Sequence, residues 1–247
     1  MIVIKYGGHA LPRAGVPDEI LKTIADFHLA LNRVVLVHGG GPQVDAELEI
    51  HGIPTEMISG YRHTSPAVFE VVQKVLSGQV LRTLVNQMIG YGVNAVGLSA
   101  GDGETIRATK MEPIVNGVPV DIGLVGDASK TDPSFLNLLL NHGYLPVISP
   151  VGVNSKGQGL NLNGDLAAGA KGIYRNFPDE SSLITLMSAS ELKSLQTTFH
   201  EGMIPKSKAA LAALDAGARS VRVIDGRDAA HLKAALQGHG GTVIRND

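Results

Sequence analysis

The chain has 247 residues, with 21 Lys and Arg against 23 Asp and Glu, and it contains no Cys or Trp. The formal net charge of −2 supplies no extended basic field, so neither nucleic acid nor a membrane is expected as a partner. The lack of Cys excludes disulfides, thiolate nucleophiles and Cys-ligated metals. The start, MIVIKY, is too short for a signal sequence, and no apolar run reaches the length of a membrane span. We therefore expect a cytoplasmic protein.

Short aliphatic runs alternate with helix-length amphipathic segments. In chain order, the pattern predicts strands at residues 2–6, 34–38, 95–99, 144–149 and 220–225. It predicts helices at residues 17–31, 42–51, 66–90, 133–141, 205–217 and 228–237. This alternation predicts an α/β three-layer sandwich, in which helices cover both faces of a mostly parallel central sheet. Ligands of such a sheet bind at the carboxyl ends of its strands.

Two stretches break this alternation and predict β-hairpin appendages. Residues 105–128 contain short extended runs joined by Asn116-Gly117, which is typical of a tight hairpin turn. A second extended pair is predicted over residues 151–163, turning at Lys156-Gly157. No internal repeat or low-complexity linker interrupts the chain, so we expect one domain.

Two predicted strands end in glycine turns. Lys5 precedes Gly7 and Gly8, and VHGGGPQVD places Gly40 and Gly41 after the second strand. Together these turns favour a phosphate or carboxylate site built from backbone N–H groups and helix N-termini. Either turn alone is equally well explained by tight strand-to-helix geometry. Neither G-x-x-x-x-G-K-[ST] nor G-x-G-x-x-G is present, so the common nucleotide-binding loops are poor interpretations.

A serine esterase is a distant alternative. Gly97-Leu98-Ser99-Ala100-Gly101 matches the G-x-S-x-G elbow, and HGGG lies upstream of it. An elbow must lead into a helix, whereas Ser99 is followed by AGDGETIRATK, a turn and a strand-like alternation. No downstream acid and His are singled out as partners of this serine.

Polar side chains recur at alternate positions in GLNLNGDL. In an extended segment this spacing puts Asn161, Asn163 and Asp165 on one face, where they can bind a polar substrate and orient lysines. The competing interpretation is a polar turn that caps a helix near residue 166. In GMIPKSKAAL, Lys206 and Lys208 fall in the first turns of a helix, where a cation opposes the helix dipole. One of them therefore plausibly serves an anionic ligand, and a solvated lysine is the better interpretation for Lys208.

Six motifs in order resemble the acetylglutamate kinases of the amino-acid kinase family: IKYGGHA, VHGGGPQVD, SGYRHTSP, AVGLSAGDG, LNLNGD and GMIPKSKAAL. The resemblance covers nearly the whole chain. It implies the amino-acid kinase fold over residues 1–247, with a lobe at about 1–165 for the amino acid and one at about 166–247 for nucleotide. It also implies phosphoryl transfer from ATP with Mg²⁺ to the side-chain carboxylate of N-acetyl-L-glutamate, in arginine biosynthesis.

The resemblance assigns roles residue by residue. Lys5 and Lys206 would neutralise the transferring phosphoryl group, and Asp165 would organise them. Acetylglutamate would contact Gly40, Gly41, Arg62, Asn161 and Asn163, with Arg62 pairing the carboxylate that does not react. The nucleotide would contact Gly7, Gly8, Thr198, Phe199 and His200. No protein-ligated metal is implied.

The sequence departs from the family in two places. His63 stands where a small aliphatic residue usually follows the arginine. After Ala170 the chain lacks roughly fifteen residues by comparison, so a helix from Leu166 would have barely two turns. This favours, as an alternative, a catalytically weak relative that serves as a sensor or partner subunit. A kinase of carrier-linked 2-aminoadipate is a further alternative. Because the chain begins at its first strand, we expect an arginine-insensitive homodimer.

Overall fold

The computed structural model describes residues 1–7, 18–115, 117–162, 173–176, 179–196, 199, 204–224 and 228–247. For Glu180 and for residues 204–206 only the backbone is described. The chain divides into two compact units, Met1–Asp165 and Leu166–Asp247. Each unit is described by itself.

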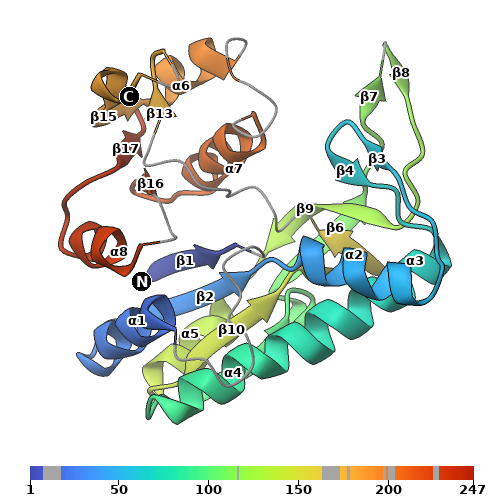
Figure 1. Cartoon of the computed structure of the whole chain (residues 1–247), viewed down its shortest axis with the longest axis horizontal. Coiled ribbons are helices and arrows are strands. Elements are labelled where there is room, and N and C mark those ends of the chain that lie inside the picture. The colour runs from blue at the N-terminus through green and yellow to red at the C-terminus, as the bar shows by residue number, and fades with distance from the viewer. Residues whose placement is uncertain are drawn as a thin grey trace. The chain divides into compact units, whose positions relative to one another are not determined.

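The first unit follows the predicted alternation of strands and helices (Figure 1). Its helices are α1 (Glu19–Leu29), α2 (Gly41–Ile50), α3 (Pro66–Gln73), α4 (Leu81–Gly90) and α5 (Ser134–Asn141). Its strands are β1 (Ile2–Tyr6), β2 (Val34–His38), β3 (Met57–Ile58), β4 (Tyr61–Arg62), β5 (Ala95–Ser99), β6 (Ile106–Lys110), β7 (Ile114–Val115), β8 (Val118–Pro119), β9 (Val125–Thr131), β10 (Leu145–Ser149), β11 (Val151–Val153) and β12 (Gly159–Leu162). The helices and long strands lie within two residues of their predicted ends.

Four strands form the parallel sheet that the sequence predicts. Their order is β1-β2-β10-β5, and every neighbouring pair is parallel. Tyr6 is opposite His38, and Ser149 is opposite Ser99. The last residues of all four strands therefore lie at one edge of the sheet.

Helices cover both faces of this sheet, as expected. On one face, Leu136 and Leu140 of α5 pack against Val35 and Ile148, and Leu98 joins the same apolar cluster. Gly97, the neighbour of Leu98 in β5, faces α4 so closely that a Cβ would lie 3.1 Å from Leu81 and Val85 atoms. Successive strand residues point to opposite faces. Helix α4 therefore lies on the face opposite α5, and α1 packs beside α4.

The helix predicted over residues 66–90 is continuous, but its middle is not an α-helix. Between α3 and α4 the segment η2 (Lys74–Val80) is a π-helix, with hydrogen bonds that span one residue more than in an α-helix. Ser65 caps the start, because its side chain accepts from the Val68 N–H at 3.3 Å. π-Helical turns are frequent at functional sites.

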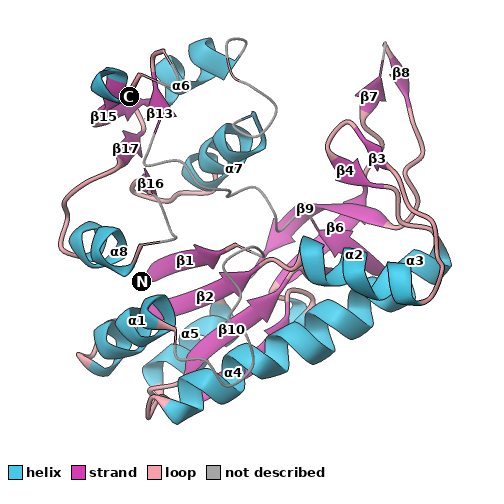
Figure 2. Ribbon diagram, viewed as in Figure 1, coloured by secondary structure: helices cyan, strands magenta, loops and turns pink. Residues whose placement is uncertain are grey.

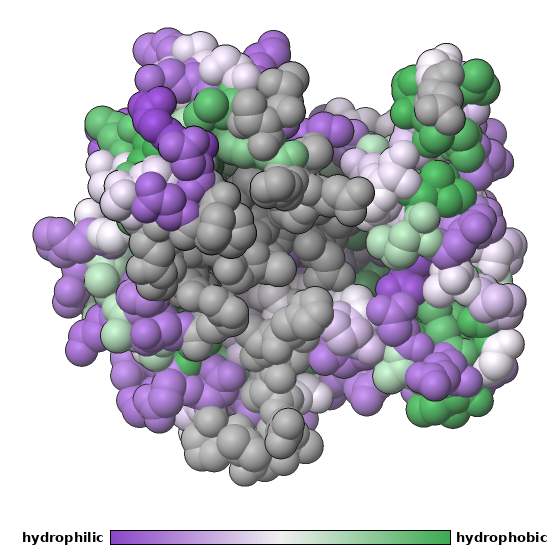
Figure 3. All heavy atoms as spheres, turned by 45° about the horizontal axis from the view of Figure 1, so that its top comes forward, coloured by the Kyte–Doolittle hydropathy of each residue, from purple (hydrophilic) through white to green (hydrophobic). Residues whose placement is uncertain are grey.

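The predicted extended stretches, 105–128 and 151–163, form a small barrel and the β7–β8 hairpin, and the β3–β4 hairpin is one that the sequence pattern does not predict (Figure 2). The barrel closes in the order β11-β12-β9-β6, and β11 and β12 are the antiparallel pair predicted over residues 151–163. β3 pairs with β4, and β7 pairs with β8. The β7–β8 hairpin carries hydrophobic residues below its tip (Figure 3), and Ile114 and Val118 are largely exposed.

The second unit packs short strands against helices. Its elements are β13 (Ile173–Tyr174), β14 (Leu183–Ile184), β15 (Leu186–Ser188), α6 (Ala189–Leu195), α7 (Ile204–Asp215), β16 (Val221–Val223), α8 (Ala229–Leu236) and β17 (Thr242–Arg245). β15, β17 and β16 form a mixed sheet. Its core contains Met187, Leu192, Leu214 and Ile244. Among the described residues of both units, no helix is long and apolar enough to cross a membrane.

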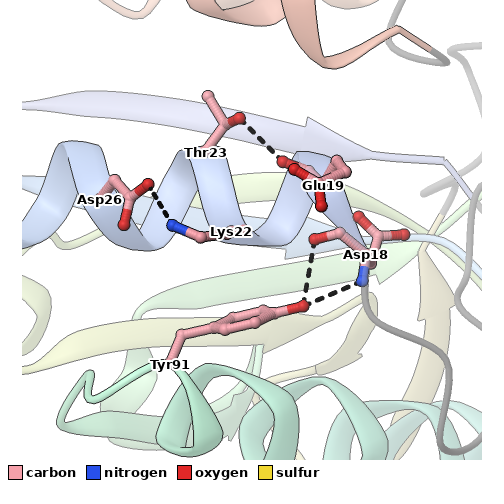
Figure 4. A network of polar contacts seen from close by, with 6 residues as sticks. All are labelled: Asp18, Glu19, Lys22, Thr23, Asp26 and Tyr91. Carbon is pink, nitrogen blue, oxygen red and sulfur yellow. Dashed lines mark hydrogen bonds and ion pairs between the residues drawn. The ribbon is translucent and has the colours of Figure 1, made fainter.

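A polar network joins the end of β1 to the start of α1 and to the end of α4. Asp18 caps α1, because its Oδ1 accepts from the Leu21 N–H at 2.8 Å, and its Oδ2 accepts from the Tyr6 hydroxyl at 2.7 Å. Tyr91, which follows α4, accepts from the Asp18 N–H at 2.9 Å (Figure 4). Tyr6 is 3% exposed, and its burial beside the Asp18 carboxylate holds its pKa well above the ordinary value. The phenol therefore stays protonated in the folded protein.

We expect Tyr6→Phe to lower the free energy of unfolding by about 2 kcal/mol near pH 8, because a buried hydrogen bond to a carboxylate is lost. Above pH about 10 the Tyr6 phenol ionises in the unfolded chain only. The free energy of unfolding of the wild type therefore falls by about 1.4 kcal/mol per pH unit, whereas that of the variant has no such contribution. The difference in free energy of unfolding between the two proteins should therefore become smaller from pH 10 upward. Urea unfolding at a series of pH values measures it, and a constant difference up to pH 11 would contradict the assignment.

Candidate functional site

A pocket lies at the carboxyl edge of the parallel sheet. It is lined by the glycine turn after β2, the β3–β4 hairpin, helix η2 and the barrel, including Gly40, Gly41, Arg62, Leu76 and Asn161. Its volume is about 80 Å³. Because about 10–15 Å³ suffices for one water molecule, the pocket has room for a small organic ligand.

The glycine turn is shaped by its contact with η2. A Cβ on Gly40 would lie 2.5 Å from Leu76 Cδ2 and 3.5 Å from Val80 Cγ2. Gly40 is also the N-cap of α2 and provides no side chain to cap it. The turn thus brings a backbone helix N-terminus, which attracts anions, to the wall of the pocket.

Arg62 reaches the pocket from β4. The hairpin turns through Ser59 and Gly60, whose φ angles of 50° and 81° suit a tight hairpin turn. Nη1 of Arg62 pairs with Oδ1 of Asp45 at 2.5 Å. The Arg62 side chain is 12% exposed and that of Asp45 is 59% exposed. A guanidinium has five N–H donors, so Asp45 orients Arg62 and leaves donors for a second carboxylate.

Asn161 and Arg62 are linked through Thr64. The Asn161 Nδ2 donates to Thr64 Oγ1 at 3.2 Å, and Thr64 Oγ1 donates to the Arg62 carbonyl at 2.8 Å. Thr64 is fully buried. Its carbonyl accepts from the Leu124 N–H at 2.7 Å, and the Leu124 carbonyl accepts from the Asn161 N–H at 2.8 Å. Three segments distant in sequence are therefore joined at one point beside the pocket.

Ser99 is in a cluster of hydroxyls at the same edge. Its hydroxyl donates to Ser77 of η2 at 3.0 Å, and Ser77 and Ser149 lie 2.8 Å apart. The 3₁₀ turn η3 (Asp102–Glu104) and strand β6 follow Ser99, and no α-helix begins between them. The esterase interpretation requires an elbow helix and a histidine partner, and this arrangement contains neither among the described residues that bind Ser99.

The predicted phosphate-handling residues are only partly described. Lys5 and Gly7 lie at the end of β1, at the same sheet edge as the pocket. Lys206 lies in the first turn of α7. Phe199 is partly buried and packs against the core of the second unit. Five predicted residues lie outside the described part of the chain: Gly8, Asn163, Asp165, Thr198 and His200.

Three residues of this region were not singled out from the sequence. Leu76 and Asp45 are ordinary members of amphipathic helices, and nothing in their spacing separates them from other helix residues. Thr64 follows the arginine in RHTSP, where a hydroxyl before Ser-Pro is most simply interpreted as part of a helix cap. The motif GYRHTSP indicates that this stretch is part of the site, but it does not indicate which of its side chains points toward the pocket.

Comparison with known proteins identifies the family. Residues 1–225 match the Amino acid kinase family. The acetylglutamate kinase of Paenarthrobacter aurescens is 39% identical over 256 residues, which cover 92% of this chain and 80% of that protein. The acetylglutamate kinase of Cutibacterium acnes is 38% identical and covers 100% of this chain and 87% of that protein.

A solved structure of similar fold is that of N-acetylglutamate synthase from Neisseria gonorrhoeae, complexed with coenzyme A and N-acetyl-glutamate. It has a TM-score of 0.79 and 23% identity, and it covers 99% of this chain and 59% of that one, so it supports the fold alone. The alignment with the Cutibacterium acnes kinase runs over 270 positions, whereas this chain has 247 residues. At least 23 of these aligned positions are therefore gaps in this chain.

The contact between Gly123 and Thr64 provides a test of the junction beside the pocket. Gly123 has a φ of 78°, and a Cβ there would lie 2.2 Å from the Thr64 carbonyl oxygen. Gly143 has a φ of 79° with open space around it, so Gly143→Ala isolates the conformational cost, about 1–2 kcal/mol. We expect Gly123→Ala to lower the free energy of unfolding by at least about twice as much. Equal losses in chemical denaturation would show that the close contact is absent in solution.

Proposed function

Because the chain belongs to the amino acid kinase family, we propose that it transfers the γ-phosphoryl group of ATP to the side-chain carboxylate of N-acetyl-L-glutamate, a step of arginine biosynthesis. The observation that carries this proposal is the pocket. The Gly40-Gly41 turn, Arg62 and Asn161 come from separate stretches of the sequence, yet they line one cavity. Its wall carries an arginine, an amide, a helix N-terminus and apolar side chains.

Acetylglutamate presents two carboxylates and one amide to this pocket. Arg62 would bind the carboxylate that does not react, since its fork of N–H donors matches a carboxylate and Asp45 engages only part of that fork. Asn161 would bind the polar groups near it, with Asn163 assisting. The glycine turn at Gly40 and Gly41 would face the reacting carboxylate, where the positive end of α2 favours developing negative charge. Leu76 and Val72 would contact the aliphatic chain.

The phosphoryl step would rest on positioning and charge. The attacking carboxylate is already a nucleophile, so no general base is needed. Lys5 and Lys206 would neutralise the charge that spreads over the transferring group, and Asp165 would hold those lysines in place. Gly7 and Gly8 would offer N–H groups to phosphate, and Thr198, Phe199 and His200 would lie along the nucleotide.

Magnesium would enter with ATP. Mg²⁺ keeps several water ligands and binds nucleotide phosphates more often than a cage made only of protein groups. The described residues contain no group of three or more His, Asp or Glu that could hold a metal ion. An ion carried by the nucleotide would neutralise the phosphate oxygens.

The alternatives differ in what they predict. A sensor or partner subunit would bind acetylglutamate without turnover, and the missing segment favours it, whereas the retained Lys5 and Lys206 favour the kinase. A kinase of carrier-linked 2-aminoadipate is less favoured, because the HGGGP and GYR motifs resemble those of acetylglutamate kinases more closely. We also propose a homodimer that works in the cytoplasm.

The kinase assay measures ADP release with Mg²⁺, ATP and acetylglutamate. We expect Arg62→Ala to raise KM for acetylglutamate by about 10- to 100-fold with a smaller change in kcat, because it removes binding that precedes the reaction. Lys5→Ala should lower kcat by about 100-fold or more with a small change in that KM. Unchanged substrate affinity in Arg62→Ala would overturn its assignment. Ester hydrolysis lost in Ser99→Ala, without ADP, would support the esterase instead.

The missing segment should weaken nucleotide binding more than substrate binding. Calorimetry compares this chain with the Cutibacterium acnes relative, using acetylglutamate and a non-hydrolysable ATP analogue, after intact-mass measurement. We expect the acetylglutamate Kd values to agree within about threefold, and the analogue to bind this chain at least about tenfold more weakly, a loss of 1.4 kcal/mol or more. Low-micromolar analogue binding by a chain of 247 residues would show that the missing segment is dispensable.

A further inference from the structure

Thr64 differs from the other residues around the pocket. It is fully buried and does not line the cavity, but its hydroxyl contacts two residues that do. One contact is to the Arg62 carbonyl and the other is to the Asn161 side-chain amide, at 2.8 and 3.2 Å. A polar group buried to this extent must be satisfied internally. These two hydrogen bonds can stabilise the fold, and they can also orient the groups that line the pocket.

The proton count fixes the direction of both bonds. A threonine hydroxyl has one proton to donate and two lone pairs that accept. The proton goes to the Arg62 carbonyl, which can only accept, so toward Asn161 the hydroxyl must act as the acceptor. The Nδ2 of Asn161 therefore faces Thr64. A reversed amide would put two acceptors against each other or take the proton away from Arg62.

The backbone of Thr64 is anchored at the same time. Its N–H donates to the Ile122 carbonyl at 2.9 Å, and its carbonyl accepts from the Leu124 N–H at 2.7 Å. Gly123 lies so close that only a glycine fits against the Thr64 carbonyl. The hydroxyl is thus held at a fixed point, from which it can fix Asn161 and the main chain at Arg62.

We infer that Thr64 is a positioning residue of the acetylglutamate pocket: its hydroxyl sets the amide orientation of Asn161 and ties it to the β4 strand that carries Arg62. The inference rests on the proposed function. Thr64 does not touch the substrate and acts through Asn161 and Arg62. The two groups that would recognise the substrate therefore move as one unit.

The test compares two substitutions of the same residue. Thr64→Val keeps the shape of the side chain and removes the hydroxyl, so Asn161 loses its fixed orientation. We expect KM for acetylglutamate to rise about tenfold, as for the loss of one positioned hydrogen bond, with kcat and KM for ATP changed less than threefold. Thr64→Ser keeps the hydroxyl and should restore KM to within about twofold of the wild type.

A control variant separates positioning from stability. Thr105 is also buried in the first unit, and its hydroxyl donates to the Asp102 carbonyl at 2.8 Å, away from the pocket. Thr105→Val should lower thermal stability while leaving KM for acetylglutamate unchanged. If Thr64→Val lowers stability in the same way and leaves KM unchanged, Thr64 has a structural role only and the inference is wrong.

A double substitution tests whether Thr64 acts through Asn161. In an Asn161→Ala background, adding Thr64→Val should raise KM by less than about threefold, because the amide that Thr64 orients is already gone. Independent, multiplicative effects would overturn the inference while leaving the proposed function intact. A wild-type chain that neither binds nor phosphorylates acetylglutamate would overturn the proposed function, and the inference with it.

Discussion

The parallel register of the four-stranded sheet is the constraint on which the rest of the first unit depends. Because β1, β2, β10 and β5 all run the same way, their polar connections leave from one edge. β10 continues through Pro150 directly into β11, so the barrel begins at that edge. The barrel then returns the chain along β12, which carries Asn161 to the glycine turn after β2. An antiparallel strand in this set would send one of these groups to the opposite side.

Two close backbone contacts, at Gly40 and Gly123, fix the positions of segments beside the sheet edge. Gly40 fits against Leu76 of the π-helix, and Gly123 fits against the carbonyl of Thr64. In each pair the missing Cβ allows one segment to approach another more closely than any other residue would permit. Gly40 therefore brings main chain to the wall of the pocket, and Gly123 holds Thr64 beside it, so both contacts support a site whose wall includes a short hairpin.

Much of this architecture could be predicted from the sequence. The strands at residues 2–6, 34–38 and 95–99 and the helices around them have clear periodicity, and packing does not override it. Gly40, Gly41, Arg62 and Asn161 could be named because motifs in order identify a family. Asp45 and Thr64 could not, because their importance comes from partners 17 and 97 positions away, Arg62 and Asn161, which local patterns do not contain. The π-helical turn was missed for a related reason, since Ser77 and Gly78 fit an α-helical pattern equally well.

The π-helical segment limits which changes in length the chain can tolerate. The hydrogen bonds of a π-helix span one residue more than those of an α-helix, so removing one residue between Lys74 and Val80 can convert the segment to an α-helix and keep α4 in phase with α3. An α-helix turns about 100° per residue, so a deletion just outside this segment would rotate α4 against α3 by about that angle. Val68 and Val72 of α3 and Leu84 and Met88 of α4 could then not all remain buried. A deletion within the segment would instead shift Leu76 against Gly40 and Ser77 against Ser149. The length of this long helix is therefore adjustable by one residue within the π-helical segment, through local contacts of Leu76 and Ser77, and fixed by the packing of α3 and α4 on either side of it.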